Sequence, residues 1–152
     1  MPASDSTARR PHVLIAEDDP PSAELLEAYL GEKEYEIQTA ADGEETLRKL
    51  KQWRPDLVLL DVMMPKISGF EVCKRLRADP AIRDTAVLMV TALDQPSDID
   101  RAVEAGTDEF LSKPINRTEL LLRVRNLLKS RQYKRELDRA LDYFDRMQQE
   151  DA

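Results

Sequence analysis

Short apolar runs alternate with amphipathic stretches along residues 12–113. Five runs are typical of buried strands: HVLIAE (12–17), YEIQTA (35–40), DLVLLD (56–61), AVLMVTA (86–92) and EFLSK (109–113). The stretches between them have helical spacing and helix-end signals, and they predict helices at 20–31, 42–53, 69–78 and 97–106. Continuous apolar strands favour a parallel sheet that is covered on both faces. The alternation therefore predicts an α/β fold with a doubly wound, five-stranded parallel sheet.

A single long helical pattern begins at Asn116, and no proline or glycine interrupts it. About 33 helical residues would span about 50 Å, whereas a domain of this size has a radius of gyration of about 14 Å. We therefore expect an extended last helix that projects from the body. Its far half carries an apolar stripe with heptad-like spacing: Tyr133, Leu137, Leu141, Phe144 and Met147. The stripe favours a coiled coil or a partner-binding helix over a helix that folds back on its own domain.

These patterns divide the chain into three parts. Residues 1–10 are polar, and we expect a disordered tail there. Residues 11–128 form the folded domain, and 129–152 form a helical extension that acts as a coiled coil or a linker. We expect this extension either to form a homodimer or to dock as a helix on a protein partner.

Composition and charge narrow the choice of partners and location. The net charge is −7, and residues 129–152 contain six basic and six acidic residues. We therefore expect no nucleic-acid partner and no membrane partner. No apolar run approaches the length of a membrane span. The one cysteine, Cys73, fits a cytoplasmic protein without a disulfide, and its place on the apolar side of a predicted helix favours a core role.

Polar residues gather where the predicted strands end. They are Glu17, Asp18 and Asp19 at the first strand, Asp61 at the third, Thr91 at the fourth and Lys113 at the fifth. Taken singly, each is explained by a solvated turn, a helix cap or a surface loop. Taken together they favour a site, because a doubly wound sheet binds ligands at the carboxyl ends of its strands.

The acidic residues of this edge require a cation. Two carboxylates about 4 Å apart repel by roughly 4 kcal/mol at an effective dielectric constant of about 20. Hard oxygen ligands suit Mg²⁺. With the Lys113 ammonium and the Thr91 hydroxyl nearby, the site suits a phosphoryl group that arrives at Asp61.

Four motifs, in this order, resemble those of response-regulator receiver domains of two-component signalling: LIAEDD, LLDVMMPKISGFEVCKRLR, VLMVTA and FLSKP. The resemblance covers residues 11–128 and implies a flavodoxin-like fold of the receiver type. It implies that a sensor histidine kinase or a phosphotransfer protein of a phosphorelay donates a phosphoryl group to Asp61. It also implies that Mg²⁺ binds to Glu17, Asp18, Asp61 and the backbone carbonyl of Met63.

The same resemblance assigns roles to three further residues. Lys113 would bind the phosphate. Thr91 and Phe110 would be switch residues that alter the face formed by the fourth helix, the fifth strand and the fifth helix. Phe110 stands where the family often has tyrosine, and it lacks the hydroxyl group of that residue.

The leading hypothesis is a signalling switch that catalyses only its own phosphorylation and dephosphorylation. A first alternative is a receiver fragment of a larger effector, such as a cyclase, a phosphodiesterase or a kinase. An aspartate-nucleophile phosphatase of the haloacid-dehalogenase type is disfavoured because Met63 stands where that class has its second aspartate. A flavin or nucleotide binder on a flavodoxin-like sheet is also disfavoured, because the chain has four glycines and no glycine-rich phosphate loop.

Overall fold

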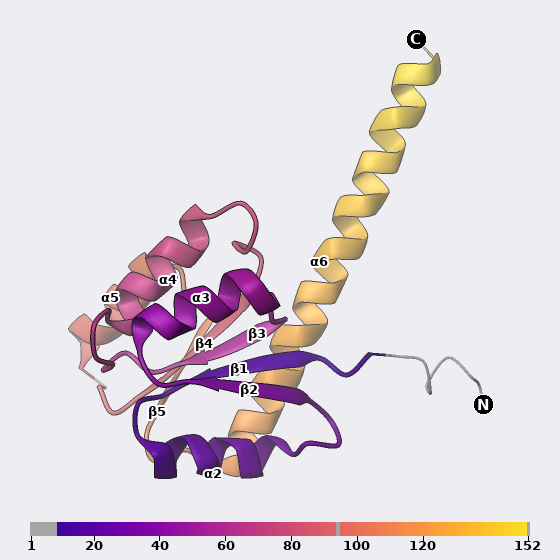
Figure 1. Cartoon of the computed structure of the whole chain (residues 1–152). Helices are drawn as coiled ribbons and strands as arrows, with labels where there is room; N and C mark the ends of the chain where they lie inside the picture. Colours follow the sequence, from indigo (N-terminus) through magenta and orange to yellow (C-terminus); the bar gives the residue numbers. More distant parts are fainter. Residues whose placement is uncertain (1–8, 94, 152) are drawn as a thin grey trace.

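Five parallel strands form one sheet in the order β2-β1-β3-β4-β5 (Figure 1). The strands are β1 (His12–Ala16), β2 (Glu36–Ala40), β3 (Leu57–Leu60), β4 (Ala86–Thr91) and β5 (Glu109–Ser112). The structure is a computed structural model, and it describes residues 9–93 and 95–151. The predicted doubly wound sheet is confirmed. Its strand order changes direction between β1 and β3, which is where such sheets place ligand sites.

Helices cover both faces of the sheet (Figure 1). One face carries α2 (Pro20–Leu30) and α6 (Arg117–Asp151), and the other carries α3 (Gly43–Trp53), α4 (Gly69–Ala78) and α5 (Pro96–Ala105). Capping explains where several of them begin and end. The side chains of Asp19, Asp42 and Ser68 accept hydrogen bonds from the first turns of α2, α3 and α4, and Gly31 ends α2 with a φ of 83°.

The strands supply two apolar layers because successive side chains face opposite sides of the sheet. Leu14, Val58 and Met89 pack with α3, α4 and α5, whereas Ile15 and Leu59 pack with α2 and α6. All residues of β3 and β4 are buried. Cys73 lies in the first layer and is fully buried, as predicted, and burial raises the pKa of its thiol to about 11.

Three predicted strands are shorter in the structure by the polar residue at their carboxyl end. Glu17, Asp61 and Lys113 each donate one last backbone hydrogen bond, to Ala40, Ala16 and Thr91 respectively. The chain then leaves the sheet, since a charged side chain at the next position cannot enter the apolar layers. The shortening therefore puts the three charged residues at the carboxyl edge of the sheet, where Glu17 and Asp61 are buried and Lys113 is half-buried.

The last helix projects from the body, as expected from its length (Figure 1). Leu120 and Val124 are fully buried against the sheet, and the side chain of Arg131 is only 13% exposed. From residue 132 to residue 149 every side chain is exposed. The docked part of α6 therefore ends at Arg131, close to the domain boundary at residue 128 that the sequence predicts.

The carboxylate of Asp56, at the amino-terminal edge of the sheet, holds α6 at the point where the helix leaves the body. Asp56 precedes β3 and accepts hydrogen bonds from Arg131 at 2.9 Å, from Arg9 at 3.0 Å and from the backbone N–H of His12 at 2.8 Å. Arg131 also donates to the backbone oxygen of Asp84 at 3.0 Å. Arg9 belongs to the predicted tail, and residues 1–8 of that tail lie outside the described part of the chain. The network joins the amino-terminal segment, the sheet and α6.

We expect Asp56→Asn to lower the free energy of unfolding by about 2 kcal/mol at pH 7, because Arg131 loses a half-buried partner. Burial by itself raises the pKa of Asp56, but the His12 N–H, Arg9 and Arg131 together hold it below its usual value. A depressed folded-state pKa gives stability that is complete above the unfolded-state pKa of about 4 and is lost as the pH falls through the folded-state value.

Urea denaturation at pH 7 and at several values below pH 4 measures this effect. The difference in the free energy of unfolding between wild type and Asp56→Asn should become smaller at acid pH. The exposed Asp100, on α5, provides the matched control, and Asp100→Asn should change stability little at any pH. Equal stability of wild type and Asp56→Asn at pH 7 would contradict the role of the network.

Candidate functional site

Acidic side chains meet at the carboxyl edge of the sheet, between β1 and β3. Glu17 and Asp18 follow β1, and Asp61 follows β3. Each of the three offers a carboxylate oxygen, and these oxygens lie within 4.8 Å of one another. The predicted juxtaposition of these residues is therefore present in the structure.

Lys113 is the one cation that ion-pairs with this cluster among the described residues. Its ammonium lies 3.2 Å from Asp61 Oδ2 and also contacts Glu17 Oε1. Burial by itself lowers the pKa of Lys113, but the hydrogen bond to Glu17 and the charge of Asp61 outweigh it and raise that pKa. The lysine is therefore a fixed positive charge. It offsets one of three carboxylates, so the cluster retains a negative charge when all three are ionised.

Glu17 is the carboxylate of the cluster whose ionised form is most destabilised by burial. Its side chain is 2% exposed, and burial, followed by a hydrogen bond shared with Asp61, raises its pKa to about 7. Its Oε2 atom is buried and has no hydrogen-bond partner in the described part of the chain. A buried carboxylate oxygen without a partner is costly.

A divalent cation fits these observations. The donor set consists of hard carboxylate oxygens, and the residual charge is negative. The buried Oε2 of Glu17 also lacks a hydrogen-bond partner within residues 9–93 and 95–151. Asp18 is exposed and lies at the open side of the cluster. Asp19 takes no part, because its carboxylate caps α2 through the N–H and the hydroxyl of Ser22.

The loop after β3 is held so that Asp61 stays at the mouth of the site. The backbone N–H of Met63 donates to Asp61 Oδ1 at 3.1 Å, and the Met63 side chain is 61% exposed. Gly69 packs so closely on this loop that an added Cβ would lie 2.3 Å from the backbone oxygen of Asp61. Glycine is therefore required at position 69, and it brings the start of α4 against the acidic residue.

Lys66 fastens the same loop to α3. It has a φ of 71° and forms ion pairs of 3.5 Å with both Asp42 and Glu44 at the start of that helix. This contact was not predicted from the sequence. The acidic start of α3 gave a signal, but nothing in the sequence showed that the loop after β3 would reach it.

Thr91 is the last residue of β4, as predicted, and Phe110 is the second residue of β5. Thr91 is fully buried, and its hydroxyl accepts a hydrogen bond of 3.3 Å from the backbone N–H of Leu93. Phe110 is half-buried, is in register with Met89 of β4 and packs against the layer that faces α3, α4 and α5. All of the residues predicted for the site therefore lie on one edge of the sheet or in the strands that lead to it.

Comparison with known proteins decides the family. The family model described as the response regulator receiver domain matches residues 13–125. The chain belongs to the response regulator receiver family. The receiver domain of this chain is 43% identical over 119 residues to the DNA-binding dual master transcriptional regulator RpaA of Synechocystis, and 43% identical over 115 residues to the response regulator PleD of Caulobacter vibrioides.

The alignments cover 78% and 76% of this chain but only 49% of RpaA and 25% of PleD. The receiver domain thus spans half or less of the length of these curated relatives.

Solved receiver domains have the same architecture. The signal receiver domain of a histidine kinase from Syntrophus aciditrophicus is 37% identical, with a TM-score of 0.74 over 79% of this chain and 91% of that one. The receiver domain of sensor histidine kinase PA1611 from Pseudomonas aeruginosa is 26% identical, with a TM-score of 0.74 over 80% of this chain and 99% of that one. The description of the PA1611 structure places a magnesium ion in its active-site cleft.

The chain is thus the receiver domain of a two-component response regulator. Receiver domains are phosphoaccepting switches that bind Mg²⁺ at an acidic pocket, and the acidic cluster of this one consists of Glu17, Asp18 and Asp61. The family assignment favours the signalling hypothesis over the phosphatase and flavin-binding alternatives. None of the helices that the structure describes has the combination of length and apolar sequence that a membrane span requires.

Proposed function

We propose that Asp61 of this receiver domain accepts a phosphoryl group from a phosphohistidine of a sensor histidine kinase or a phosphotransfer protein. The observation that carries the proposal is the contact of Asp61 with Lys113 inside the acidic cluster at the β1/β3 edge. In the transfer, a carboxylate oxygen of Asp61 forms a bond to phosphorus while the bond from phosphorus to the donor nitrogen breaks. The electron pair of that bond returns to the donor imidazole.

Each neighbour of Asp61 has a separate task in this step. Lys113 holds a positive charge beside Oδ2 and attracts the phosphoryl oxygens. The Met63 N–H orients Oδ1. When bound by Glu17, Asp18, Asp61 and the backbone carbonyl of Met63, Mg²⁺ supplies positive charge that offsets the charge of the transferred group.

The switch residues link this chemistry to a surface. The phosphorylated Asp61 attracts the Thr91 hydroxyl, which exchanges its hydrogen bond with Leu93 for one to the phosphoryl group. Phe110 then moves toward the space that Thr91 vacates. The surface affected is formed by α5, β5 and α6. It exposes three apolar side chains of α5 and α6, which supports a role in binding a partner: Ile99, Val103 and Leu122.

Chemical mapping of the modified residue tests the proposal. Acetyl phosphate with Mg²⁺ should add one phosphoryl group to the chain, measured by intact-protein mass spectrometry. Borohydride reduction of the aspartyl phosphate, followed by peptide sequencing, should place the modification at Asp61. An unmodified chain, or a modification in a peptide without Asp61, would refute the assignment.

We further propose that the projecting part of α6 mediates self-association or docking to a helical partner. Leu137, Leu141 and Phe144 are between 54% and 61% exposed, and Tyr133 and Met147 extend the same stripe. Two copies of α6 side by side would bury it as a coiled coil. Isolated receiver domains would then be brought together by their last helices.

We expect the full chain to dimerise in sedimentation equilibrium and Leu137→Glu/Phe144→Glu to be monomeric, because a buried charge in the seam is unpaired. Gln132→Glu/Gln149→Glu adds the same charge away from the stripe and should remain dimeric. The measurement is made with and without beryllofluoride. Monomers throughout would exclude self-association and leave only docking to another protein.

A second arrangement is that the chain is the receiver part of a longer effector, such as a cyclase, a phosphodiesterase or a kinase. The lengths of the curated relatives support it, because the aligned region is only 25–49% of RpaA and PleD. The open reading frame that encodes the chain distinguishes the arrangements. The absence of a nucleic-acid partner stays a prediction for these 152 residues, although RpaA is described as DNA-binding.

A further inference from the structure

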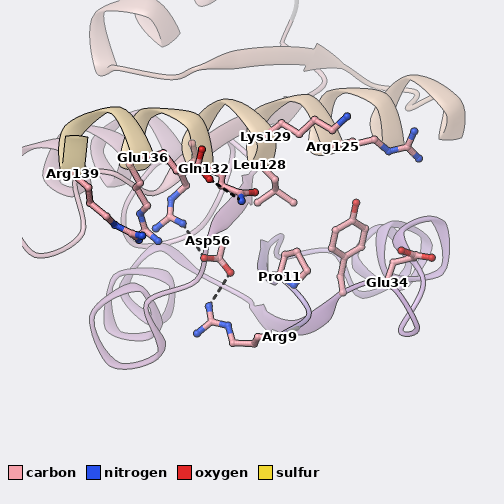
Figure 2. A pocket seen from close by; sticks show the side chains of 13 residues that line it. Arg9, Pro11, Glu34, Asp56, Arg125, Leu128, Lys129, Gln132, Glu136 and Arg139 are labelled. Atoms are coloured by element: carbon pink, nitrogen blue, oxygen red, sulfur yellow. Dashed lines mark hydrogen bonds and ion pairs between the residues drawn. The ribbon is translucent and has the colours of Figure 1, made fainter. Parts of the chain in front are cut away.

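A groove lies between α6 and the amino-terminal ends of the strands (Figure 2). Pro11, Tyr35 and Asp56, which precede β1, β2 and β3, form one wall, and α6 forms the other. The step from Asp56 to Asp61 along β3 spans about 16 Å, so the groove is separate from the acidic cluster. Its volume is about 590 Å³, which lies within the range of about 300–1,000 Å³ of small-molecule sites.

The groove is positively charged although the chain is acidic. Six basic residues line it: Arg9, Arg125, Lys129, Arg131, Arg135 and Arg139. Three acidic residues line it as well: Glu34, Asp56 and Glu136. The difference of six and three is a charge of +3, in a chain whose net charge is −7. Such a local reversal of sign attracts anions.

Most of these cations have no partner of opposite charge among the residues that the structure describes. The two oxygens of Asp56 are occupied by Arg9, Arg131 and the His12 N–H. In residues 9–93 and 95–151, no ion pair or hydrogen bond is formed by the side chains of four groove residues: Arg125, Lys129, Arg135 and Arg139. These four side chains are exposed and free to bind a ligand.

The pKa shifts of Arg131 and Tyr35, which line the groove, also indicate an excess of positive charge there. Burial, followed by the charge of Arg135, lowers the pKa of Arg131 in spite of its ion pair with Asp56. The guanidinium groups of Arg131 and Arg135, which lie one turn apart on α6, therefore repel each other. Burial raises the pKa of the Tyr35 hydroxyl, whereas the charge of Arg125 opposes that rise. An anion beside Arg125 and Arg135 would relieve the repulsion.

The shape of the groove restricts the kind of anion. The cations follow one side of α6 from residue 125 to residue 139, a distance of about 21 Å along the helix axis. Five of the six are arginines, whose planar forks bind phosphate oxygens in pairs. Beside them lie Tyr35, Pro11 and Leu128, which are half-buried and offer an apolar surface for a ring. Figure 2 shows Leu128 of α6 above Pro11, with Arg125 and Lys129 next to them.

We propose that this groove binds a nucleoside polyphosphate, with its phosphates on Arg125, Lys129 and Arg135 and its base against Tyr35 and Pro11. The ligand would join α6 to the segments before β1 and β2, next to the point where the helix leaves the body. The proposal is independent of phosphoryl transfer to Asp61, because none of the groove residues contacts the acidic cluster.

Isothermal titration calorimetry of the full chain with ATP tests the proposal. EDTA is included so that the acidic cluster holds no metal–nucleotide complex. We expect one saturable site with a dissociation constant below about 1 mM. AMP and inorganic tripolyphosphate should each bind more weakly than ATP. AMP lacks most of the phosphates that the basic residues would bind, and tripolyphosphate lacks the base that would lie against Tyr35 and Pro11. Asp61→Asn should bind ATP as wild type does, which separates this site from the acidic cluster.

Matched variants locate the site. Arg125→Ala/Arg135→Ala should weaken ATP binding by about tenfold or more, since charged hydrogen bonds to phosphate are lost. Arg117→Ala/Arg146→Ala removes the same charge from the same helix outside the groove, and should weaken it by less than about twofold, because exposed distant charges are screened. Tyr35→Leu should reduce the affinity for ATP to that for tripolyphosphate.

Three results would overturn the proposal. The first is the lack of saturable ATP binding to the wild-type chain. The second is an equal loss in the groove and control variants, which would show attraction by overall charge alone. The third is tighter binding of a polyglutamate peptide than of ATP, which would assign the groove to an acidic protein segment.

Discussion

Asp61→Asn should accept a phosphoryl group from acetyl phosphate at least about 1,000-fold more slowly than wild type, a change of about 4 kcal/mol in the barrier. The amide has no ionised oxygen to attack phosphorus, although it has nearly the same shape as the carboxylate. The variant should fold normally, because the substitution removes one of three crowded negative charges. Incorporation of phosphate measured over time gives the ratio of the rates.

Asp19→Asn is the matched control for this experiment. It changes an aspartate two residues from Glu17, but that side chain caps α2 and asparagine caps a helix equally well. It should be phosphorylated at the wild-type rate. If Asp61→Asn were labelled as fast as this control, another residue would be the acceptor.

Asp18→Ala should bind Mg²⁺ about tenfold more weakly than wild type, a loss of about 1.4 kcal/mol. The carboxylate of Asp18 is the exposed member of the cluster, so its removal deletes a ligand and lowers the negative charge without opening the core. The remaining carboxylates repel less, and the unfolding free energy should not fall in metal-free buffer. A Mg²⁺ titration followed by calorimetry measures the affinity, and urea denaturation measures the stability.

The same Asp19→Asn variant controls for the loss of one negative charge nearby. It should keep the wild-type affinity for Mg²⁺, because its side chain bonds Ser22 and not the cluster. Unchanged affinity in Asp18→Ala would remove that residue from the metal site. A cooperative loss of folding in Asp18→Ala would instead show that its carboxylate stabilises the fold.

The sheet and its functional edge could be predicted because both depend on local patterns. An apolar run sets where a strand ends, and the parallel arrangement then brings Glu17, Asp61 and Lys113 to the same edge although Glu17 and Lys113 are 96 residues apart. The ends of the helix predicted at 20–31 were marked by Pro20 at its start and Gly31 at its end. Motif resemblance added the roles of the residues, which geometry alone does not assign.

Contacts between long side chains could not be predicted in the same way. Asp56 and Arg131 are 75 residues apart, and no periodicity links them. Residues 129–152 contain equal numbers of basic and acidic residues. This equal count gave no indication that the basic side chains gather on one surface. In three dimensions Lys129, Arg131, Arg135 and Arg139 line the groove beside the body, at the end of the docked part of α6 and the start of the projecting segment. A count of charges contains no information about the direction in which each side chain points.

Because α6 packs on the body only as far as Arg131, the rest of the helix is a rigid arm that extends from the domain. α6 begins beside the edge that carries Lys113, runs back across the sheet and leaves at the opposite edge (Figure 1). The 20 residues that follow Arg131, up to Asp151, form an arm of about 30 Å. A tilt of about 5° at the fulcrum would move the tip by about 2.6 Å, half of one helical turn. If α6 tilts about the Asp56–Arg131 contact, a small rotation at the body would become a larger displacement at the far end of the helix.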